Sequence, residues 1–185
     1  ARGVAVNVDV LGLVHADLGE YAEAQRLHEE NLARRRAQHD LYGTVLTLNN
    51  LGSVAARSQA YVEAQRLYDE AMTLAQTLEF RSGLSLSLLN LSSLAYWRGD
   101  AEAALPLAQR AMTVTQEINN HRNVTWALVN LGNAHLGLGN YAEATHYLYE
   151  AARLALALRA IPRTLTALTS IAALNLTGLS NAETK

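Results

Sequence analysis

The sequence contains no cysteine, two prolines and a single phenylalanine among its 185 residues. Without cysteine, the chain forms no disulfide and offers no thiolate to a metal. The scarcity of proline suits long helices, because proline interrupts a helix interior. No apolar run is long enough to span a bilayer and no signal peptide is visible, so we expect a cytoplasmic protein that has no membrane partner.

An excess of charge of one sign is also missing. The 15 basic and 17 acidic residues give a formal net charge of −2. This balance provides no basic surface for a phosphate backbone, and we expect no nucleic-acid partner. The only basic run is Arg34-Arg35-Arg36, which follows Glu29 and Glu30 by about one helical turn. The spacing predicts ion pairs on a solvated helix face.

Motifs of catalysis and of metal binding are absent as well. The six histidines lack the spacing of a metal site, and we expect His15 and His135 to be packed or capped. The sequence has no glycine-rich phosphate loop, nucleophile motif or paired-carboxylate arrangement. We therefore expect a protein that is not an enzyme and that holds no metal or cofactor.

What the chain does have is a repeat of forty residues. Each repeat opens with Leu-Gly or Leu-Ser, and three repeats carry Tyr-x-Glu-Ala about ten residues later. A fixed period in this range predicts a repeat architecture, here one array over residues 1–185, and the incomplete ends suggest a longer parent array. Four full repeats align without a gap, flanked by two partial units: 11–50, 51–90, 91–130 and 131–170, with 1–10 and 171–185 at the ends.

Each repeat has the pattern of two helices. Leu84, Leu88 and Leu91 fall on one helix face, and Gly99-Asp100 is typical of a helix end followed by an N-cap. Asn140 with Glu143 resembles a capping box. The pattern predicts an all-α fold, a right-handed α-solenoid of antiparallel helix pairs. About nine helices are expected, at roughly 2–18, 21–38, 42–58, 61–78, 82–98, 101–118, 122–138, 141–158 and 162–177.

The Leu-Gly opening, the Gly before the turn, and the spaced Tyr and Ala resemble the tetratricopeptide repeat (TPR) across essentially the whole chain. The period is forty residues rather than the usual 34. In this respect the chain is similar to the arrays of kinesin light chains and of bacterial signal-transduction regulators. The resemblance implies a concave groove lined by a second stripe on the first helix of each repeat.

The resemblance places one asparagine per repeat in this groove and implies that its carboxamide grips the backbone of an extended peptide. The alternative is that each asparagine bridges to the neighbouring helix and registers the stack, and that the aromatic side chains serve ordinary packing. Arg57 could pair with Asp17 or with a ligand. Leu46, Leu86 and Trp126 stand where TPRs that bind acidic chaperone tails carry a cation, so we do not expect such a tail. The predicted groove residues are Asn50, Asn90, Asn130, Asn133, Arg57, Leu46, Leu86, Tyr96, Trp97 and Trp126.

Two functions follow as hypotheses. The first is a scaffold that binds a peptide or helix of a partner protein in the groove. The second is a sensor or oligomerisation segment of a larger bacterial regulator, which responds to a small molecule or to self-association. The second is motivated by the forty-residue period and the incomplete ends. In addition, the apolar residues of the last predicted helix lack a covering helix and could support a homodimer. These residues are Leu165, Leu168, Ile171 and Leu174.

Overall fold

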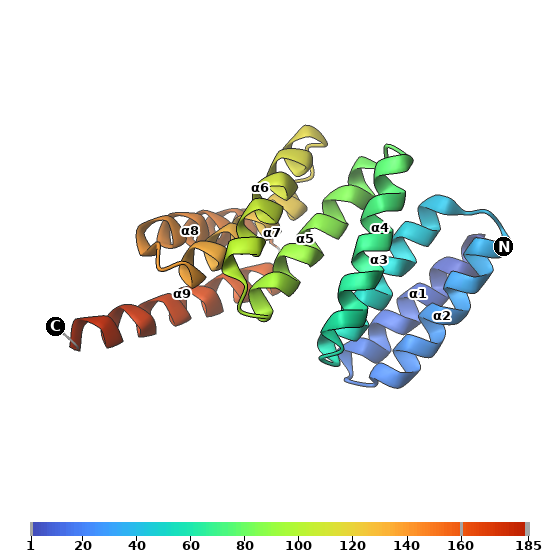
Figure 1. The fold of residues 1–185 in the computed structure, drawn as a ribbon, viewed down its shortest axis with the longest axis horizontal. Coiled ribbons are helices and arrows are strands. Elements are labelled where there is room, and N and C mark those ends of the chain that lie inside the picture. The colour runs from blue at the N-terminus through green and yellow to red at the C-terminus, as the bar shows by residue number, and fades with distance from the viewer. Residues whose placement is uncertain (1, 160, 184–185) are drawn as a thin grey trace. The chain divides into compact units, whose positions relative to one another are not determined.

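The computed structural model describes the backbone of residues 2–159 and 161–183, and the side chains of residues 8–159 and 163–174. Within this described backbone the chain folds into nine α-helices and no strand (Figure 1), as the sequence predicts. Most of the side chains of the partial units at 1–10 and 171–185 lie outside this description. The helices are α1 (Arg2–Asp17), α2 (Tyr21–Ala37), α3 (Leu41–Arg57), α4 (Tyr61–Thr77), α5 (Arg81–Trp97), α6 (Ala101–Glu117), α7 (His121–Gly137), α8 (Tyr141–Ala157) and α9 (Ile161–Glu183).

The turns between helices recur every twenty residues. Each turn contains one residue of positive φ. In the turns from Gly19 to Gly139 its successor donates a backbone hydrogen bond to the carbonyl five residues back, as Asp100 N does to Ala95 O at 2.9 Å. This is the Schellman ending, for which glycine is best suited. The positive-φ residues are Gly19, Gly99 and Gly139, together with the non-glycine residues His39, Gln59, Glu79, Asn119 and Arg159.

Side-chain caps begin only some of the helices. Asp100 accepts a hydrogen bond from Ala103 N at 3.0 Å, as predicted, and Asp40 and Asn120 cap α3 and α7 in the same way. The predicted capping box at Asn140 is wrong. Its side chain makes no cap bond to α8 and instead contacts His135 Nδ1 at 3.3 Å, because a nearby ring nitrogen competes with the backbone amides for the carboxamide.

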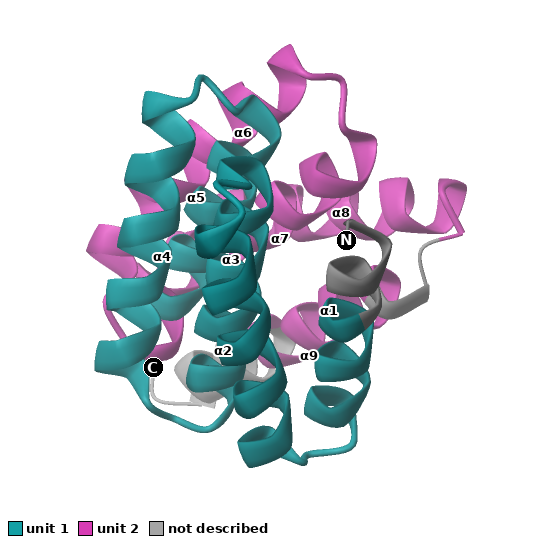
Figure 2. Cartoon of the chain, turned by 90° about the vertical axis from the view of Figure 1, so that its right-hand side faces the viewer, with its two compact units in different colours: residues 1–94 teal, residues 95–185 magenta. Residues whose placement is uncertain are grey.

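The chain divides into two compact units, residues 1–94 and 95–185, with the boundary inside α5 (Figure 2). In the first unit α3 packs against α4 and α2, and α1 packs against α2. In the second unit α7 packs against α6, α8 and α9. Each unit therefore contains helix pairs of the kind that the repeat predicts.

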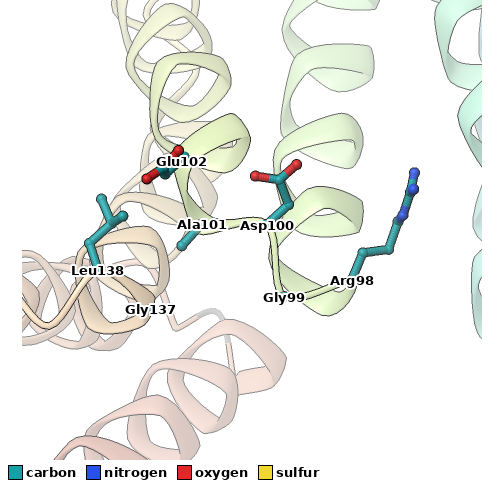
Figure 3. Close-up of a pocket in the computed structure, with 7 residues that line it drawn as sticks. All are labelled: Arg98, Gly99, Asp100, Ala101, Glu102, Gly137 and Leu138. Carbon is teal, nitrogen blue, oxygen red and sulfur yellow. The ribbon is translucent and has the colours of Figure 1, made fainter.

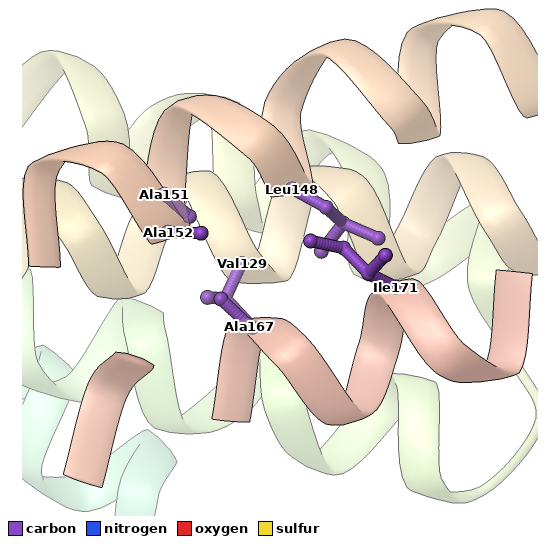
Figure 4. Packing of buried hydrophobic residues seen from close by; sticks show 6 residues of the cluster. All are labelled: Val129, Leu148, Ala151, Ala152, Ala167 and Ile171. Atoms are coloured by element: carbon purple, nitrogen blue, oxygen red, sulfur yellow. The ribbon is translucent and has the colours of Figure 1, made fainter. Parts of the chain in front are cut away.

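Small residues allow close approach within these pairs. The alanines that follow the Tyr-x-Glu signal, and their counterpart in the irregular third repeat, are fully buried: Ala24, Ala64, Ala104 and Ala144. In the first unit, Ala24 packs against Ala16 and Val54. In the second unit, a cluster formed by α7, α8 and α9 includes Val129, Leu148 and Ile171 (Figure 4).

The last helix departs from the prediction in two ways. It continues to Glu183, because Leu179 stands where the earlier turns have residues that tolerate positive φ more readily. The expectation that Ile171 and Leu174 are uncovered is wrong, since both are buried, and Ile171 packs into the cluster of α7 and α8. Leu165 and Leu168 are exposed as predicted. Within the described residues, none of the helices combines the length and hydropathy needed to cross a membrane.

Candidate peptide-binding groove

In the first unit, the predicted groove stripe lies on α3 and α5. Leu46 of α3 is 39% exposed, and Leu86 of α5 is half-buried. Asn50, one turn beyond Leu46, is also half-buried, and none of the described residues forms a hydrogen bond with its carboxamide. Asn50 therefore presents free donors and a free acceptor beside an exposed apolar side chain, an arrangement suited to a peptide backbone.

Asn90 has a different environment from Asn50. It is 5% exposed, and its Nδ2 donates to Asn49 Oδ1 at 2.9 Å. Asn49 in turn donates to Ser87 Oγ at 3.0 Å and to the carbonyl of Val45 at 2.9 Å. This buried network joins α3 to α5, and it is the kind of contact by which a carboxamide registers neighbouring helices.

Arg57 at the end of the α3 stripe is already paired. Its Nη1 donates to Asp17 Oδ1 at 2.8 Å, and its guanidinium carbon lies 5.8 Å from the centre of the Tyr21 ring. The hydrogen bond to Asp17 raises the pKa of Arg57, with a further contribution from Tyr21. A ligand charge at this position would compete with Asp17, which is itself solvent-exposed.

In the second unit, the predicted stripe runs along α7. Trp126 is half-buried and Asn130 is buried. The carboxamide oxygen of Asn133 is buried and accepts no hydrogen bond from any described residue. Over Trp126 lies Arg163 of α9, whose guanidinium carbon is 3.9 Å from the ring centre. Arg163 was not predicted as a groove residue, because it comes from the helix that follows this repeat.

Tyr96 and Trp97 differ in their surroundings although they are neighbours at the end of α5. Tyr96 packs against the cluster of Ala95, Ala104 and Ala134, whereas Trp97 is 55% exposed. Nearby, a shallow cavity of about 400 Å³ opens between the α5–α6 turn and the end of α7 (Figure 3). The residues that line it are Arg98, Gly99, Asp100, Ala101, Glu102, Gly137 and Leu138.

A buried polar cluster in the first unit has no counterpart among the predicted residues. Asp9 of α1 contacts Arg35 Nη2 at 2.7 Å and His28 Nδ1 at 3.1 Å, both from α2, and Thr47 of α3 donates to it at 3.3 Å. Later repeats mostly place apolar residues at these positions, for example Leu89 in place of Asp9. A charged residue that interrupts the repeat pattern is the signal that could have identified this cluster.

The cluster corrects the prediction for the basic run. Arg34 pairs with Glu30 at 2.9 Å on the helix surface as expected, but Arg35 is buried between Asp9 and Asp40. Residue 35 points toward α1 and α3, where a buried guanidinium requires carboxylate partners. Arg36 forms an ion pair with Glu70 of α4 rather than with a residue of its own helix.

Glycines and hydrogen bonds hold the cluster together. A Cβ on Gly12 would lie 2.5 Å from His28 Nε2, and one on Gly43 would lie 1.6 Å from Arg35 Nη1, so both positions require glycine. Burial alone would raise the pKa of Asp9, but hydrogen bonds from His28 and Asn31 and the charge of Arg35 outweigh burial and hold that pKa below its usual 3.8. The carboxylate is therefore ionised at neutral pH.

The histidines that were expected to be packed or capped are accounted for. His15 contacts Glu20, and His135 stacks on Tyr147 with ring centres 5.5 Å apart. In the part of the chain that the structure describes, three His, Asp or Glu side chains nowhere gather in the way a metal ion requires.

The repeat pattern and this geometry agree with a comparison to known families. The profile of the tetratricopeptide repeat matches residues 5–77 and 84–157. The chain belongs to the tetratricopeptide repeat family. TPRs generally mediate protein–protein interaction and typically do not catalyse reactions. No curated protein matches the sequence.

Solved structures similar to this TPR chain share its fold at low sequence identity. A putative kinesin light chain of Podosopora anserina with nearly identical TPR-like repeats has a TM-score of 0.72 and 15% identity, over 99% of this chain and 90% of that one. BtubC (BKLC) from P. vanneervenii has a TM-score of 0.70 and 19% identity, over 84% of this chain and 64% of that one. These likenesses confirm the predicted class, an all-α, TPR-like α-solenoid.

A third similar structure belongs to a much longer protein. It is the Signal Transduction ATPase with Numerous Domains (STAND) protein PH0952 from Pyrococcus horikoshii, which has a tetratricopeptide repeat sensor. The TM-score is 0.71 and the identity 16%, over 90% of this chain. This chain spans only 26% of that protein, and the likeness concerns the fold of the TPR region.

Proposed function

We propose that this TPR chain is a non-catalytic interaction module that binds a peptide or helix of a partner protein along the stripe of its first helices. The observation that carries the proposal is the presence of free carboxamide groups on that stripe in both units. Asn50 has no hydrogen-bond partner among the described residues, and Asn133 Oδ1 is buried without one. A buried acceptor that is unpaired costs about 1–3 kcal/mol, which a peptide N–H would recover.

The neighbours of these carboxamides support the same function. Leu46 and Trp126 place apolar surface next to Asn50 and Asn133 on the same helices, and aromatic side chains are enriched where binding energy concentrates. Asn90 has a smaller role in this proposal, because it already donates to Asn49. The carboxamide that would hold a peptide is therefore Asn50 in the first unit and Asn133 in the second, while Asn90 mainly positions α5 against α3.

The test uses dodecapeptides selected from a random phage-displayed library against the intact chain. We expect Asn50→Ala to weaken a selected peptide that binds the first unit, and Asn133→Ala one that binds the second unit, roughly tenfold in each case, the loss of about one buried hydrogen bond. Gln109→Ala is the matched control, since Gln109 is an exposed carboxamide on α6. Equal affinity of all variants, with the helical circular dichroism spectrum retained, would overturn the groove assignment.

A second function has its own support. We infer as an alternative that the chain is a sensor or self-association segment of a larger regulator. The likeness to the TPR region of a STAND protein supports it, as do exposed apolar side chains at both ends of the chain. These are Val10, Leu11, Leu13 and Val14 on α1, Leu18 directly after it, Leu156 on α8, and Leu165 and Leu168 on α9.

A further inference from the structure

Arg163 is unusual among the arginines of this chain. It is half-buried, yet its only described contact is the ring of Trp126, 3.9 Å from its guanidinium carbon. Burial lowers the pKa of Arg163, and no neighbouring carboxylate counteracts this effect. By contrast, seven other arginines contact a carboxylate: Arg26, Arg34, Arg35, Arg36, Arg57, Arg66 and Arg153.

The contact with Trp126 leaves the hydrogen-bonding capacity of Arg163 unused. An indole offers an N–H donor and a π face but no acceptor atom, whereas a guanidinium has five N–H donors. The cation–π attraction holds the side chain in place. The cation–π contact does not replace the hydrogen bonds to water that the N–H groups lose on burial. An acceptor group with two oxygens would replace them.

The surrounding charge favours an anionic ligand. Helix α7 contains no Asp or Glu, and the only acidic residue of α9 is Glu183 at its last position. Arg122 adds positive charge in the first turn of α7, one turn before Trp126. Arg163 lies in the first turn of α9, where the helix dipole also favours negative charge.

The location ties this cation to the stripe on α7. Trp126 and Asn133 lie seven residues apart on one helix face, about 10 Å along the axis. Asn133 Oδ1 is buried without a hydrogen-bond partner. The separation along α7 is short enough for one peptide to extend from Arg163, on Trp126, to the position of Asn133.

We propose that Arg163, held on Trp126, is a subsite for a carboxylate of the bound peptide. The proposal rests on the peptide-binding function above and names the ligand class: a peptide with an acidic side chain or a free C-terminal carboxylate at this point. A planar carboxylate matches the two parallel N–H bonds that a guanidinium offers. The cation comes from the following helix, which is why the position of Trp126 needs no Lys or Arg of its own.

The experiment titrates the intact chain with small carboxylates and follows ¹H–¹⁵N signals of Trp126 Nε1–H and Arg163 Nε–H. N-acetylglutamate amide probes an acidic side chain, N-acetylalanine probes a C-terminal carboxylate, and N-acetylglutamine amide is the uncharged control. Exposed Trp97 is an internal reference. We expect saturable shifts at Trp126 and Arg163 with at least one carboxylate, and the stronger of the two identifies the source.

Variants sharpen the assignment. Arg163→Gln should weaken the response roughly ten- to a hundredfold, the loss of hydrogen bonds to a charged group. Arg163→Lys should retain part of the response, because lysine keeps the positive charge but lacks the two parallel N–H donors of the guanidinium. Arg159→Gln should leave it unchanged. Four results would each overturn the subsite: an equal response to the glutamine analogue, tighter binding of inorganic phosphate, loss of the response in Arg159→Gln, or shifts at Trp97 alone.

The proposal of a carboxylate subsite and the proposal of a peptide-binding groove can be contradicted independently. A selected peptide that binds wild type and Arg163→Gln with equal affinity would overturn the carboxylate subsite and leave the groove in place. A chain that selects no peptide, but whose Trp126 and Arg163 signals respond to N-acetylglutamate amide, would overturn peptide binding and leave an anion site.

Discussion

Asp9 puts a carboxylate at a position where the later repeats carry Asn49, Leu89 and Val129. On the face of α1 that meets α2 and α3, it is accompanied by Gly12 and Ala16, so little apolar surface is buried there. The larger apolar residues in the described part of α1 from residue 10 onward are exposed: Val10, Leu11, Leu13 and Val14. The docking of α1 therefore depends strongly on the ion pair of Asp9 with Arg35.

We predict that Asp9→Asn lowers the free energy of unfolding by about 2–4 kcal/mol at neutral pH, because it removes one partner of a buried pair. The folded pKa of Asp9 lies below its usual 3.8, so this contribution is complete above pH 3.8 and is lost as the pH falls further. Urea unfolding of both proteins across this range measures the difference.

Asp17→Asn is the matched control for Asp9→Asn. Asp17 also pairs with an arginine, but it is exposed, and a surface pair contributes about 0.5 kcal/mol or less. Equal destabilisation by the two substitutions would contradict the account of α1. A difference in the free energy of unfolding between wild type and Asp9→Asn that becomes larger at low pH would contradict it as well.

At the level of single residues, the sequence places the proposed groove side chains that share a repeat position, but it does not reveal residues that break the pattern. Asn50 and Trp126 follow from periodicity. Arg163 does not, because its contact with Trp126 depends on how two successive first helices pack. Asp9, His28 and Arg35 come from different helices, and sequence spacing does not reveal that they meet.

Among the structural elements, the turns are where the chain departs most from ideal backbone chemistry. Five of the eight positive-φ positions carry a side chain, and Glu79 with φ 51° is one of them. A non-glycine residue in this region costs about 1–2 kcal/mol. Apart from the end of α9, helix boundaries were nevertheless predictable to within a residue or two, because the period places the turns even where glycine is absent.

We predict that Glu79→Gly raises the free energy of unfolding by about 1 kcal/mol and that Gly99→Ala lowers it by a similar amount. Gly99 is a clean test, since a Cβ added there meets nothing within 4 Å and the cost is purely conformational. Urea unfolding monitored by circular dichroism checks both. A stabilising Gly99→Ala or a destabilising Glu79→Gly would show that the turns are not limited by backbone strain.

For the whole molecule, the open question is whether exposed apolar surface serves self-association. Leu165 and Leu168 are 60% and 50% exposed on α9. If the chain acts through self-association, sedimentation velocity should show a concentration-dependent dimer that Leu165→Glu with Leu168→Glu abolishes. Val62→Glu is the control, because Val62 is an even more exposed apolar residue, on α4. A chain that stays monomeric at all concentrations would contradict the proposal that it acts through self-association.

The central claim is that the stripe of first helices holds a peptide through its free carboxamides. The most direct measurement is the ¹H–¹⁵N side-chain amide spectrum of the chain with and without a selected peptide. We predict that the signal of Asn50 or of Asn133 shifts on binding, according to the unit that holds the peptide, while those of Gln65 and Gln109 on the second helices do not. Shifts confined to the second helices, or none at the two asparagines under saturating peptide, would contradict the account.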